Sequence, residues 1–354
     1  MMSDRARELL GSFVGRRVLL VGDLMMDEWA FGTVARISPE APIPVVRMPL
    51  TPQARTGKPG GAGNVAAILL GLGAAVKVVG AVGDDENGRR LRTILESSGA
   101  DVSPVLTDTS RPTTHKLRII AGRQQLLRID TEATDPIAPE LAGQIRDQIR
   151  SGMAEADVVL VADYAKGLLT EGSFPGDVIA EARAARIPLC VDPKPANIGL
   201  FRGAYMVSPN EAEALAAAGN TDRLAEKVWF EEGDLDMPRK VLLAGIALQK
   251  KLKADMVFVT RGDQGIAVFD RDGVHEIPTA SVEGGVGDGT GCGDAAIAAS
   301  ALSLASGADL WLAAIMANAA GGVVSRFVGV HSPQPDEIVE WVEQNWPGVG
   351  RRET

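Results

Sequence analysis

The sequence predicts an α/β fold: a doubly wound, mostly parallel sheet that is flanked by helices and carries a small β lid. Short runs of β-branched residues and leucine recur along the chain, and each is followed by a turn and a longer helical pattern. Continuous apolar strands that alternate with helices are typical of a parallel sheet covered on both faces. Two further stretches, residues 29–49 and 113–130, interrupt this rhythm with short strands and hairpins.

Six apolar runs are the expected strands of the main sheet. They are residues 17–23, 76–83, 157–163, 187–192, 204–210 and 255–260. Ligands of such sheets gather at the carboxyl ends of the strands. Five of the runs end in, or just before, a polar residue, and these residues are Asp23, Asp163, Asp192, Asn210 and Thr260. Helix capping alone could also explain each of them.

The stretches 29–49 and 113–130 are expected to pair as a small separate sheet, the second with AGRQ as its turn. Strands that project from a doubly wound core form either a lid over the site or a contact between subunits, and both alternatives stay open. The acidic, aromatic-bearing residues 221–240 are interpreted as a surface insertion. The weakly polar tract from Ala295 to Val324 predicts two buried helices rather than a membrane span.

Composition places the chain among globular proteins and argues against several partners. Of 354 residues, 45% are hydrophobic and 23% are charged, and one main core over residues 1–354 is expected. The net charge of −10 argues against nucleic acid as a partner, so an anionic ligand has to be gathered by a local site. Two cysteines, Cys190 and Cys292, are too few for a disulfide framework. Because the N-terminus also lacks the apolar segment of a secretory signal, we expect a cytoplasmic protein without a membrane partner.

Glycine-rich stretches are the candidates for phosphate binding. GAGNVA at residues 61–66 matches the loose dinucleotide pattern G-x-G-x-x-A, which requires a preceding strand. TPQARTGKPG, which precedes it, is not expected to be a strand, and this disfavours the dinucleotide interpretation. A Walker loop is absent from the sequence, which excludes ordinary P-loop phosphoryl transfer.

The third stretch, GVGDGTGCGD at residues 285–294, ends on an acid before an alanine-rich apolar segment. Its glycines free backbone N–H groups to converge on an anion, and the following helix adds its partial positive end. A flexible turn with Asp294 as a helix cap is the alternative. An acidic residue beside an anion-binding site is chemically useful if a sugar hydroxyl lies between the two. Asp294 then takes the hydroxyl proton while the amides hold the phosphoryl group.

Three further stretches could serve the same reaction. SPNEAE puts Asn210 and Glu213 three residues apart at a helix start, where they either hold Mg²⁺ through water or form a capping box. VTRGDQG at residues 259–265 suits nucleotide phosphates or is a plain hairpin turn. Polar groups for sugar hydroxyls are supplied by VGDLMMDEW and GGAGNVA, namely Asp27, Gly61 and Asn64.

Taken together, these stretches resemble the ribokinase-like (PfkB) carbohydrate kinases over essentially the whole chain. The family signature D-T-x-G-A-G-D is similar to DGTGCGD at 288–294, and G-G-x-x-x-N is similar to GGAGN at 60–64. N-x-x-E is found at 210–213 and T-R-G at 260–262. The resemblance implies a ribokinase-like fold, ATP and Mg²⁺ as cofactors and a homodimer formed through the lid strands, and it allows for a monovalent cation. Gly289 and Cys292 depart from the usual Thr or Val and the usual Ala.

Within the family, several stretches are similar to the subgroup of D-glycero-β-D-manno-heptose 7-phosphate kinases. They are RISPEAPIPVV at 36–46, TTHKLRI at 113–119, QQLLRID at 124–130, DYAKG at 163–167 and VDPK at 191–194. The implied reaction transfers the γ-phosphoryl group of ATP to the C1 hydroxyl, giving the 1,7-bisphosphate for the lipopolysaccharide inner core. Because the chain ends at Thr354, no fused nucleotidyltransferase domain is expected. The alternatives are another ribokinase-like sugar or sugar-acid kinase, a non-catalytic nucleotide or sugar-phosphate sensor, and an NAD-dependent oxidoreductase.

The resemblance also implies roles for single residues. Asp294 is expected to be the general base, and the amides of Gly291, Cys292 and Gly293 are expected to stabilise the transferring phosphoryl group. The helix dipole favours ionised Asp294, which predicts a weak base. The candidates for binding the sugar 7-phosphate, of which two or three are expected to serve, are Lys116, Arg118, Arg128, Lys166 and Lys194. The expected nucleotide-binding residues are Asn210, Glu213, Thr260, Arg261, Gly262, Gly265, Gly289, Gly291, Gly293 and Asn318.

Overall fold

A computed structural model describes residues 2–122, 124–221, 236–279, 289–327 and 329–346, together with Leu224. Within these residues the larger sheet has nine strands. They are β1 (Arg17–Gly22), β5 (Ala75–Gly83), β6 (Val105–Asp108), β9 (Val158–Ala162), β10 (Leu189–Asp192), β11 (Met206–Val207), β12 (Met256–Thr260), β13 (Ile266–Asp270) and β14 (Val274–Ile277). Their spatial order is β14, β13, β12, β11, β10, β9, β1, β5 and β6.

All six predicted strands of this sheet are confirmed, and they run parallel to one another. β1 pairs in parallel with β5 and β9, and β10 pairs in parallel with β9 and β11. β11 pairs in parallel with β12, and the antiparallel strands β13 and β14 then complete that edge. VTRGDQG forms the turn between β12 and β13, so the plain-turn alternative describes its backbone, and a nucleotide role stays a prediction.

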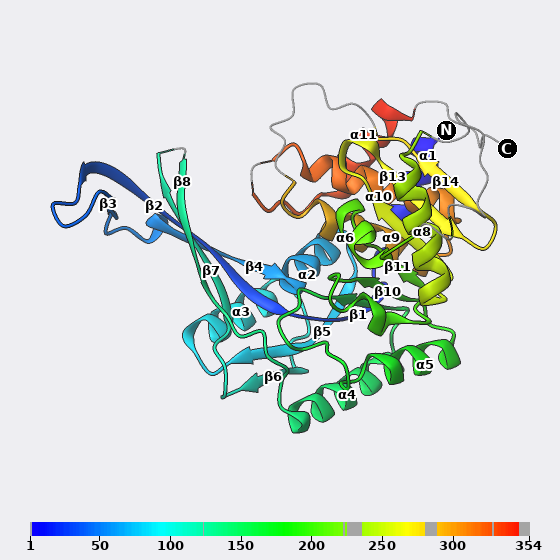
Figure 1. Ribbon diagram of the computed structural model, residues 1–354, viewed down its shortest axis with the longest axis horizontal. Coiled ribbons are helices and arrows are strands. Elements are labelled where there is room, and N and C mark those ends of the chain that lie inside the picture. The colour runs from blue at the N-terminus through cyan, green and yellow to red at the C-terminus, as the bar shows by residue number, and fades with distance from the viewer. Residues whose placement is uncertain are drawn as a thin grey trace.

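Helices cover both faces of this sheet. They are α1 (Met2–Gly11), α2 (Ala62–Gly71), α3 (Glu86–Ser97), α4 (Pro139–Met153), α5 (Pro175–Ala185), α6 (Glu211–Ala218), α8 (Arg239–Leu252), α9 (Cys292–Ala305), α10 (Leu310–Val324) and α11 (Pro335–Asn345). Val18 and Leu20 of β1 pack into one core with residues of α1, α2 and α9 to α11. Leu19 and Val21 point the other way, into a second core with α4 and α5. Figure 1 shows α4 and α5 on the opposite side of the sheet from α9 and α10.

The apolar tract near the C-terminus forms the two buried helices that the sequence predicts, α9 and α10. In the part of the chain that the structure describes, no helix has both the length and the apolar character required to cross a membrane. Most of the predicted insertion at 221–240 lies outside the described residues, as do residues 285–288 of the glycine-rich stretch.

The two stretches that break the βα rhythm belong to a second sheet, which we call the lid. Its strands are β2 (Leu24–Ile37), β3 (Pro44–Arg47), β4 (Arg55–Gly61), β7 (Thr114–Ala121) and β8 (Gln124–Thr131). β2 pairs in parallel with β7, and β7 pairs antiparallel with β8, so the predicted pairing of the two stretches is confirmed. Figure 1 shows β2, β3, β7 and β8 projecting from the helical body as a long ribbon.

The expectation that no strand precedes GAGNVA is wrong. TPQARTGKPG contains most of β4, which ends at Gly61 and leads directly into α2. The stretch has no apolar alternation because β4 lies at an edge of the lid, where Pro59 and polar residues are tolerated. Since β4 pairs antiparallel with β2, it does not form a dinucleotide-binding βαβ unit with α2.

The lid has two chemically different faces, because residues opposite one another in neighbouring strands share a face. The charged lid face groups Asp27, Lys116, Arg118, Arg128 and Asp130. The apolar lid face groups Leu117, Ile119, Leu127 and Ile129. Leu127 and Ile129 are 48% and 49% exposed. Apart from Val14 and Phe327, the exposed large apolar side chains of the described residues all lie on the lid segments.

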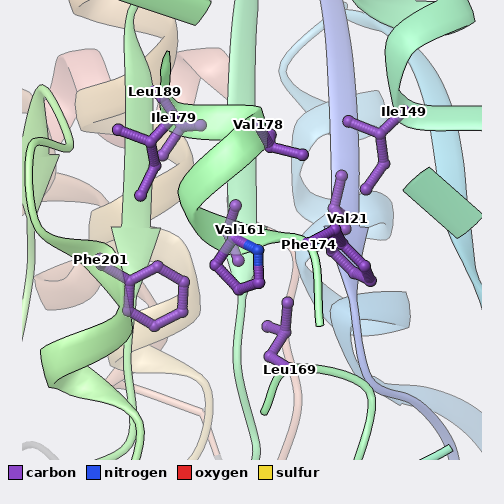
Figure 2. A pocket seen from close by; sticks show the side chains of 10 residues that line it. Val21, Ile149, Val161, Leu169, Phe174, Val178, Ile179, Leu189 and Phe201 are labelled. Carbon is purple, nitrogen blue, oxygen red and sulfur yellow. The ribbon is translucent and has the colours of Figure 1, made fainter. Parts of the chain in front are cut away.

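A cavity of about 10 Å³ lies between the sheet and α5, and its lining is apolar. Figure 2 shows Val161 and Leu189 of the sheet and Val178 of α5 around it, together with Phe174 and Phe201. The volume corresponds to about one water-sized probe, and apolar walls offer water no hydrogen-bond partners. This cavity is therefore a packing gap in the second core rather than a ligand site.

Candidate active site

The carboxyl ends of the parallel strands bring the predicted polar residues to one edge of the sheet. Strand order reverses between β1 and β9, with β5 and β6 on one side and β10 to β12 on the other. Open α/β sheets bind ligands at such a switch point. Asp23 follows β1 and Asp163 follows β9 there, whereas Asn210 and Thr260 are bridged to one another further toward β12. The polar residues at the strand ends thus lie in two neighbouring parts of one edge.

Asp294 lies in the first turn of α9, and residues from two other parts of the chain hold its carboxylate. Asn64 of α2 donates from Nδ2 to Oδ2 at 2.5 Å, and the Tyr164 hydroxyl donates to Oδ1 at 2.5 Å. The N-cap of α9 is Gly291, which has no side chain, and Asp294 lies three residues further on, inside the helix. The alternative of Asp294 as a helix cap is therefore wrong.

Burial raises the pKa of the Asp294 carboxyl, although the hydrogen bonds from Tyr164 and Asn64 and the charge of Lys194 oppose the rise. The helix dipole alone predicts the opposite, a lowered pKa and a weakly basic carboxylate. Removal of water from the carboxylate outweighs the groups that favour its charge. A raised pKa suits a group that must accept a proton.

Two buried carboxylates fix the loops that follow the central strands. Asp23 Oδ2 accepts from the backbone N–H groups of Tyr164 and Lys166 at 2.8 and 3.2 Å. Asp163 accepts from the N–H groups of Ala165 and Lys194 at 2.8 and 2.9 Å. Burial raises the pKa of Asp23 to about 6, and the neighbouring charge of Asp163 adds to the rise. Helix capping does not account for these two strand-end residues, which instead organise the loops of the site.

Asn210 and Glu213, which are expected to bind the nucleotide, form the capping box that is the alternative to metal binding. Asn210 Oδ1 accepts from the Glu213 N–H at 2.9 Å, and Glu213 Oε2 accepts from the Asn210 N–H at 3.0 Å. Glu213 Oε1 also forms an ion pair with Lys194 Nζ at 2.7 Å. Among the described residues, no three His, Cys, Asp or Glu side chains cluster to hold a metal. Oxygen donors of this kind suit Mg²⁺, and a role for the pair in holding Mg²⁺ through water stays a prediction.

Asp27, which is expected to bind the sugar, is held firmly on the charged lid face. Arg118 Nη1 donates to Asp27 Oδ1 at 2.6 Å, and the guanidinium lies 4.9 Å from the centre of the Trp29 ring. A Cβ at Gly60 would lie 2.0 Å from Asp27 Oδ2, so only glycine allows this approach. Gly61 has φ 58°, a conformation that also favours glycine. Arg118 orients Asp27, and its availability for a sugar phosphate stays a prediction.

Three of the other predicted cations also face carboxylates. Lys166 pairs with Glu132 at 2.7 Å, and Arg128 pairs with Asp130 at 2.8 Å. The Arg128 pair is the more exposed, since its arginine side chain is 48% exposed against 16% for that of Lys166. Exposed pairs are worth little and exchange partners readily. Lys116 lies beside both Asp27 and Asp130 in the strand register.

The predicted nucleotide residues around β12 support the fold in ways that the sequence did not reveal. Arg261 is buried and forms an ion pair with Glu276 of β14 at 2.8 Å. Gly265 has φ 84°, and a Cβ there would lie 2.1 Å from the Ile277 carbonyl oxygen. Asn318 Nδ2 donates to the Pro278 carbonyl at 3.0 Å. These three residues hold β14 and the segment after it against β12 and α10, and their contacts with a nucleotide stay predictions.

The glycine-rich stretch is described from Gly289 to Asp294. Gly291 has φ 83°, and a Cβ there would lie 3.3 Å from Asn64 Nδ2, the donor to Asp294. The Cys292 N–H donates to the Gly289 carbonyl at 3.2 Å. Cys292 is half-buried and outside any disulfide. In the described part of the chain, nothing lies within 4 Å of a Cβ placed on Gly293, so these residues leave room for an anion there.

The sequence does not single out Tyr164, which contributes to the site, or Glu28, which supports the lid. In the sequence, Tyr164 belongs to the stretch DYAKG, and no role is predicted for it. Its place just after an apolar strand puts it at the ligand-binding edge. Glu28 is 3% exposed, and it pairs with His115 Nε2 at 2.9 Å and with Arg90 at 3.5 Å. Because side chains alternate along β2, Glu28 points away from Asp27, and it joins β2 to its lid neighbour β7 and to α3.

Comparisons with known proteins agree with this arrangement. The profile of the pfkB family carbohydrate kinases matches residues 18–337. The chain is 39% identical over 337 residues to a bifunctional protein HldE of Geotalea uraniireducens, covering 95% of this chain and 63% of that relative. It thus spans less than two thirds of the relative's length. Ribokinase of Arabidopsis thaliana, solved with ribose and ATP, matches with a TM-score of 0.67 at 18% identity, covering 93% of this chain and 99% of that one. Phosphofructokinase-2 of Escherichia coli, solved with substrates and products, matches with a TM-score of 0.71 at 19% identity and the same coverage.

Proposed function

Because the chain belongs to the pfkB family of carbohydrate kinases, and is therefore a sugar kinase, we propose that it phosphorylates D-glycero-β-D-manno-heptose 7-phosphate at the C1 hydroxyl. The phosphoryl donor is ATP, and the product is the 1,7-bisphosphate of ADP-heptose and lipopolysaccharide core synthesis. The relatives named HldE and the subgroup-like stretches of the sequence support this choice of sugar. In such a relative, this chain corresponds to the kinase portion.

The observation that carries the proposal is the carboxylate of Asp294, held by Asn64 and Tyr164 at the start of α9. In the proposed step, the C1 oxygen forms a bond to the γ-phosphorus while the bond from that phosphorus to the β–γ bridging oxygen breaks. The hydroxyl proton passes to Asp294, and ADP leaves with the bridging oxygen. The N–H groups of Gly291 and Gly293 lie at the helix end that favours the developing negative charge, whereas the Cys292 N–H, the third amide predicted for this role, already donates to the Gly289 carbonyl.

The sugar is held on the charged lid face. Asp27, Gly61 and Asn64 are assigned to its hydroxyls, and Arg118 fixes Asp27. Lys116 and Arg128 share that face and are assigned to the 7-phosphate, because Arg118 is engaged in a largely buried ion pair whereas Arg128 has an exposed partner. Thr260, Gly262, Gly265 and Asn318 are assigned to the nucleotide side with Asn210 and Glu213. A Mg²⁺ ion held through water by Glu213 would neutralise phosphate charge.

The lid is also the proposed contact between two subunits. Its apolar face exposes Leu127 and Ile129 next to the polar body of a protein with net charge −10. Exposed apolar patches of this kind mark association sites. We assign the homodimer to this face, which leaves the charged lid face for the sugar, and we place the enzyme in the cytoplasm.

One assay tests the choice of sugar. Purified protein with ATP and Mg²⁺ is offered a panel of free and 7-phosphorylated heptoses, hexoses and pentoses, and ADP release is measured. Heptose 7-phosphate should give the highest kcat/KM, and phosphorus NMR of the product should contain a new anomeric phosphate. Preference for an unphosphorylated sugar or sugar acid would support another kinase of this fold instead. Nucleotide binding without turnover on any sugar would support a sensor.

A further inference from the structure

The residue next to the buried strand β9, Tyr164, sits in a turn that the surrounding chain holds in a costly conformation. Ala165 follows it with φ 54°, a left-handed conformation that is unfavourable for a non-glycine residue. Asp163 Oδ1 accepts from the Ala165 N–H, and Asp23 Oδ2 accepts from the N–H groups on both sides of Ala165, those of Tyr164 and Lys166. Conformations of this kind persist only where neighbouring groups over-determine them. The turn therefore presents Tyr164 in one fixed direction.

The phenol points at Asp294. Its hydroxyl donates to Oδ1 at 2.5 Å, while Asn64 Nδ2 donates to Oδ2 at 2.5 Å, so the carboxylate is gripped at both oxygens. Each carboxylate oxygen has two lone pairs, and each of these oxygens uses one of them for its donor. The second lone pair of either oxygen stays available for an incoming hydroxyl. The two hydrogen bonds therefore prevent rotation of the carboxylate but leave it accessible to a substrate.

The Tyr164 ring also connects the two halves of the site. Lys194 Nζ lies 5.6 Å from the ring centre, within the range of a cation–π contact, and the same ammonium pairs with Glu213. Asp163 accepts from the Lys194 N–H at 2.9 Å and from Asn197 Nδ2 at 3.0 Å, so the loop that carries Lys194 is tied to the turn that carries Tyr164. Displacement of the ring would disturb both contacts.

We propose that Tyr164 is a positioning residue for the kinase reaction, whose phenol fixes the carboxylate of Asp294 so that one lone pair meets the attacking hydroxyl. This role rests on the proposed function, because Asp294 is the base of that reaction. The groups that face Asp294 are Asn64 from α2, Asp27 from β2, Tyr164 after β9, and Asp192 and Lys194 from the end of β10. The phenol hydrogen bond lowers the pKa of Asp294 against the larger effect of burial.

Kinetics of Tyr164→Phe test the proposal, with Tyr205→Phe as a matched control. Tyr205 is the other tyrosine of the chain, and it lies before β11. Tyr164→Phe should lower kcat by about tenfold or more, leave KM for ATP close to wild type, and move the acid limb of the pH–kcat profile upward by about one pH unit. Tyr205→Phe should change none of the three. An unchanged acid limb in an active Tyr164→Phe enzyme would overturn the proposal, because a merely structural loss lowers the rate without moving it.

A second measurement needs no sugar at all. Protein labelled with carbon-13 at tyrosine Cζ should give two resonances, which the two phenylalanine variants assign. The Tyr164 resonance should titrate with the Asp294 carboxyl, at a midpoint above the ordinary aspartate value of about 3.9, and this step should vanish in Asp294→Asn. The Tyr205 resonance should lack the step. A flat Tyr164 resonance would overturn the contact on which the proposal stands.

The two proposals fail in different ways. If the panel identifies a different sugar, the choice of heptose fails and the Tyr164→Phe kinetics are measured with that sugar. If no sugar is phosphorylated, the proposed function fails and the titration of the Tyr164 resonance decides alone whether the phenol governs Asp294. If heptose 7-phosphate is turned over and Tyr164→Phe behaves like Tyr205→Phe, only the positioning role fails.

Discussion

Asn64 and Asp294 are separated by 230 residues of chain and meet in a 2.5 Å hydrogen bond. Asn64 lies in α2, directly after the lid strand β4, and Asp294 lies in the first turn of α9. The bond therefore joins the lid side of the site to the glycine-rich side. It also turns one oxygen of the proposed base toward the residues assigned to the sugar.

Asp294→Asn is expected to lower kcat by about 10²- to 10⁴-fold, the range typical of removing a general base. The amide keeps the shape of the side chain but cannot accept the hydroxyl proton. Steady-state kinetics with saturating ATP and sugar measure the effect, and circular dichroism confirms the fold. Near wild-type turnover of a folded Asp294→Asn protein would remove Asp294 from the role of base.

The double variant Lys116→Met/Arg128→Met is expected to raise KM for the 7-phosphorylated sugar by about tenfold or more, with a small change in KM for ATP. The proposed charge-assisted hydrogen bonds to the 7-phosphate are lost, whereas the residues assigned to the nucleotide lie beyond the central strands. Arg36→Met, on the same lid at an exposed position, serves as the control. Equal effects on both KM values would exclude this assignment.

Ile129→Asp is expected to convert a dimer into a monomer, because a carboxylate would be carried into an apolar contact. Light scattering coupled to size-exclusion chromatography measures the mass. Val14→Asp is the matched control, since Val14 is 72% exposed and lies outside the lid. A dimer that survives Ile129→Asp but dissociates in Val14→Asp would move the interface to the body.

Asp23→Asn is expected to remove a pH dependence of stability. Burial raises the pKa of Asp23 to about 6 in the folded protein, against about 3.9 when unfolded, so the folded state binds the proton more tightly. The resulting stability is fully present below about pH 4 and is lost as pH rises through about 6. The difference of about two pH units corresponds to about 3 kcal/mol of unfolding free energy.

Urea unfolding at about pH 4 and about pH 7 measures this loss. Between these two pH values, the unfolding free energy of wild type should fall by more than that of Asp23→Asn. Asp147→Asn, an exposed substitution on α4, should behave like wild type. If wild type and Asp23→Asn lost the same unfolding free energy between the two pH values, the pKa of Asp23 would not be raised in the folded protein.

Gly265→Ala is expected to destabilise the protein by about 2 kcal/mol or more. The residue has φ 84°, and a Cβ would lie 2.1 Å from a backbone oxygen of Ile277, which cannot move without displacing β14. Gly143→Ala in α4 meets nothing within 4 Å and should be neutral or stabilising by up to about 1 kcal/mol. Denaturant midpoints of the two variants compare them directly, and a stable Gly265→Ala protein would contradict the geometry.

Burial decided which elements could be predicted from the sequence. The six parallel strands are covered on both faces, so each is a near-continuous apolar run, whereas β4 lies at an edge and carries Pro59 and polar residues. Asp294 and Asn64 were found because glycine-rich stretches mark close backbone approach. Tyr164 was missed because its partner is 130 residues away and no spacing connects the two. A local sequence pattern also does not indicate which carboxylate a buried arginine pairs with. In this structure Arg261 forms an ion pair with Glu276.

In the proposed homodimer, the two faces of the lid link subunit assembly to turnover. β7 and β8 carry the residues assigned to the sugar phosphate on one side and the apolar side chains assigned to the second subunit on the other. The lid is a single sheet, so a second subunit packed on its outer face would restrict its motion. Dilution that separates the subunits would then leave the sugar-binding face free to move. Specific activity would then fall as the enzyme is diluted, and the cell could set the rate of the kinase by how much of the protein it makes.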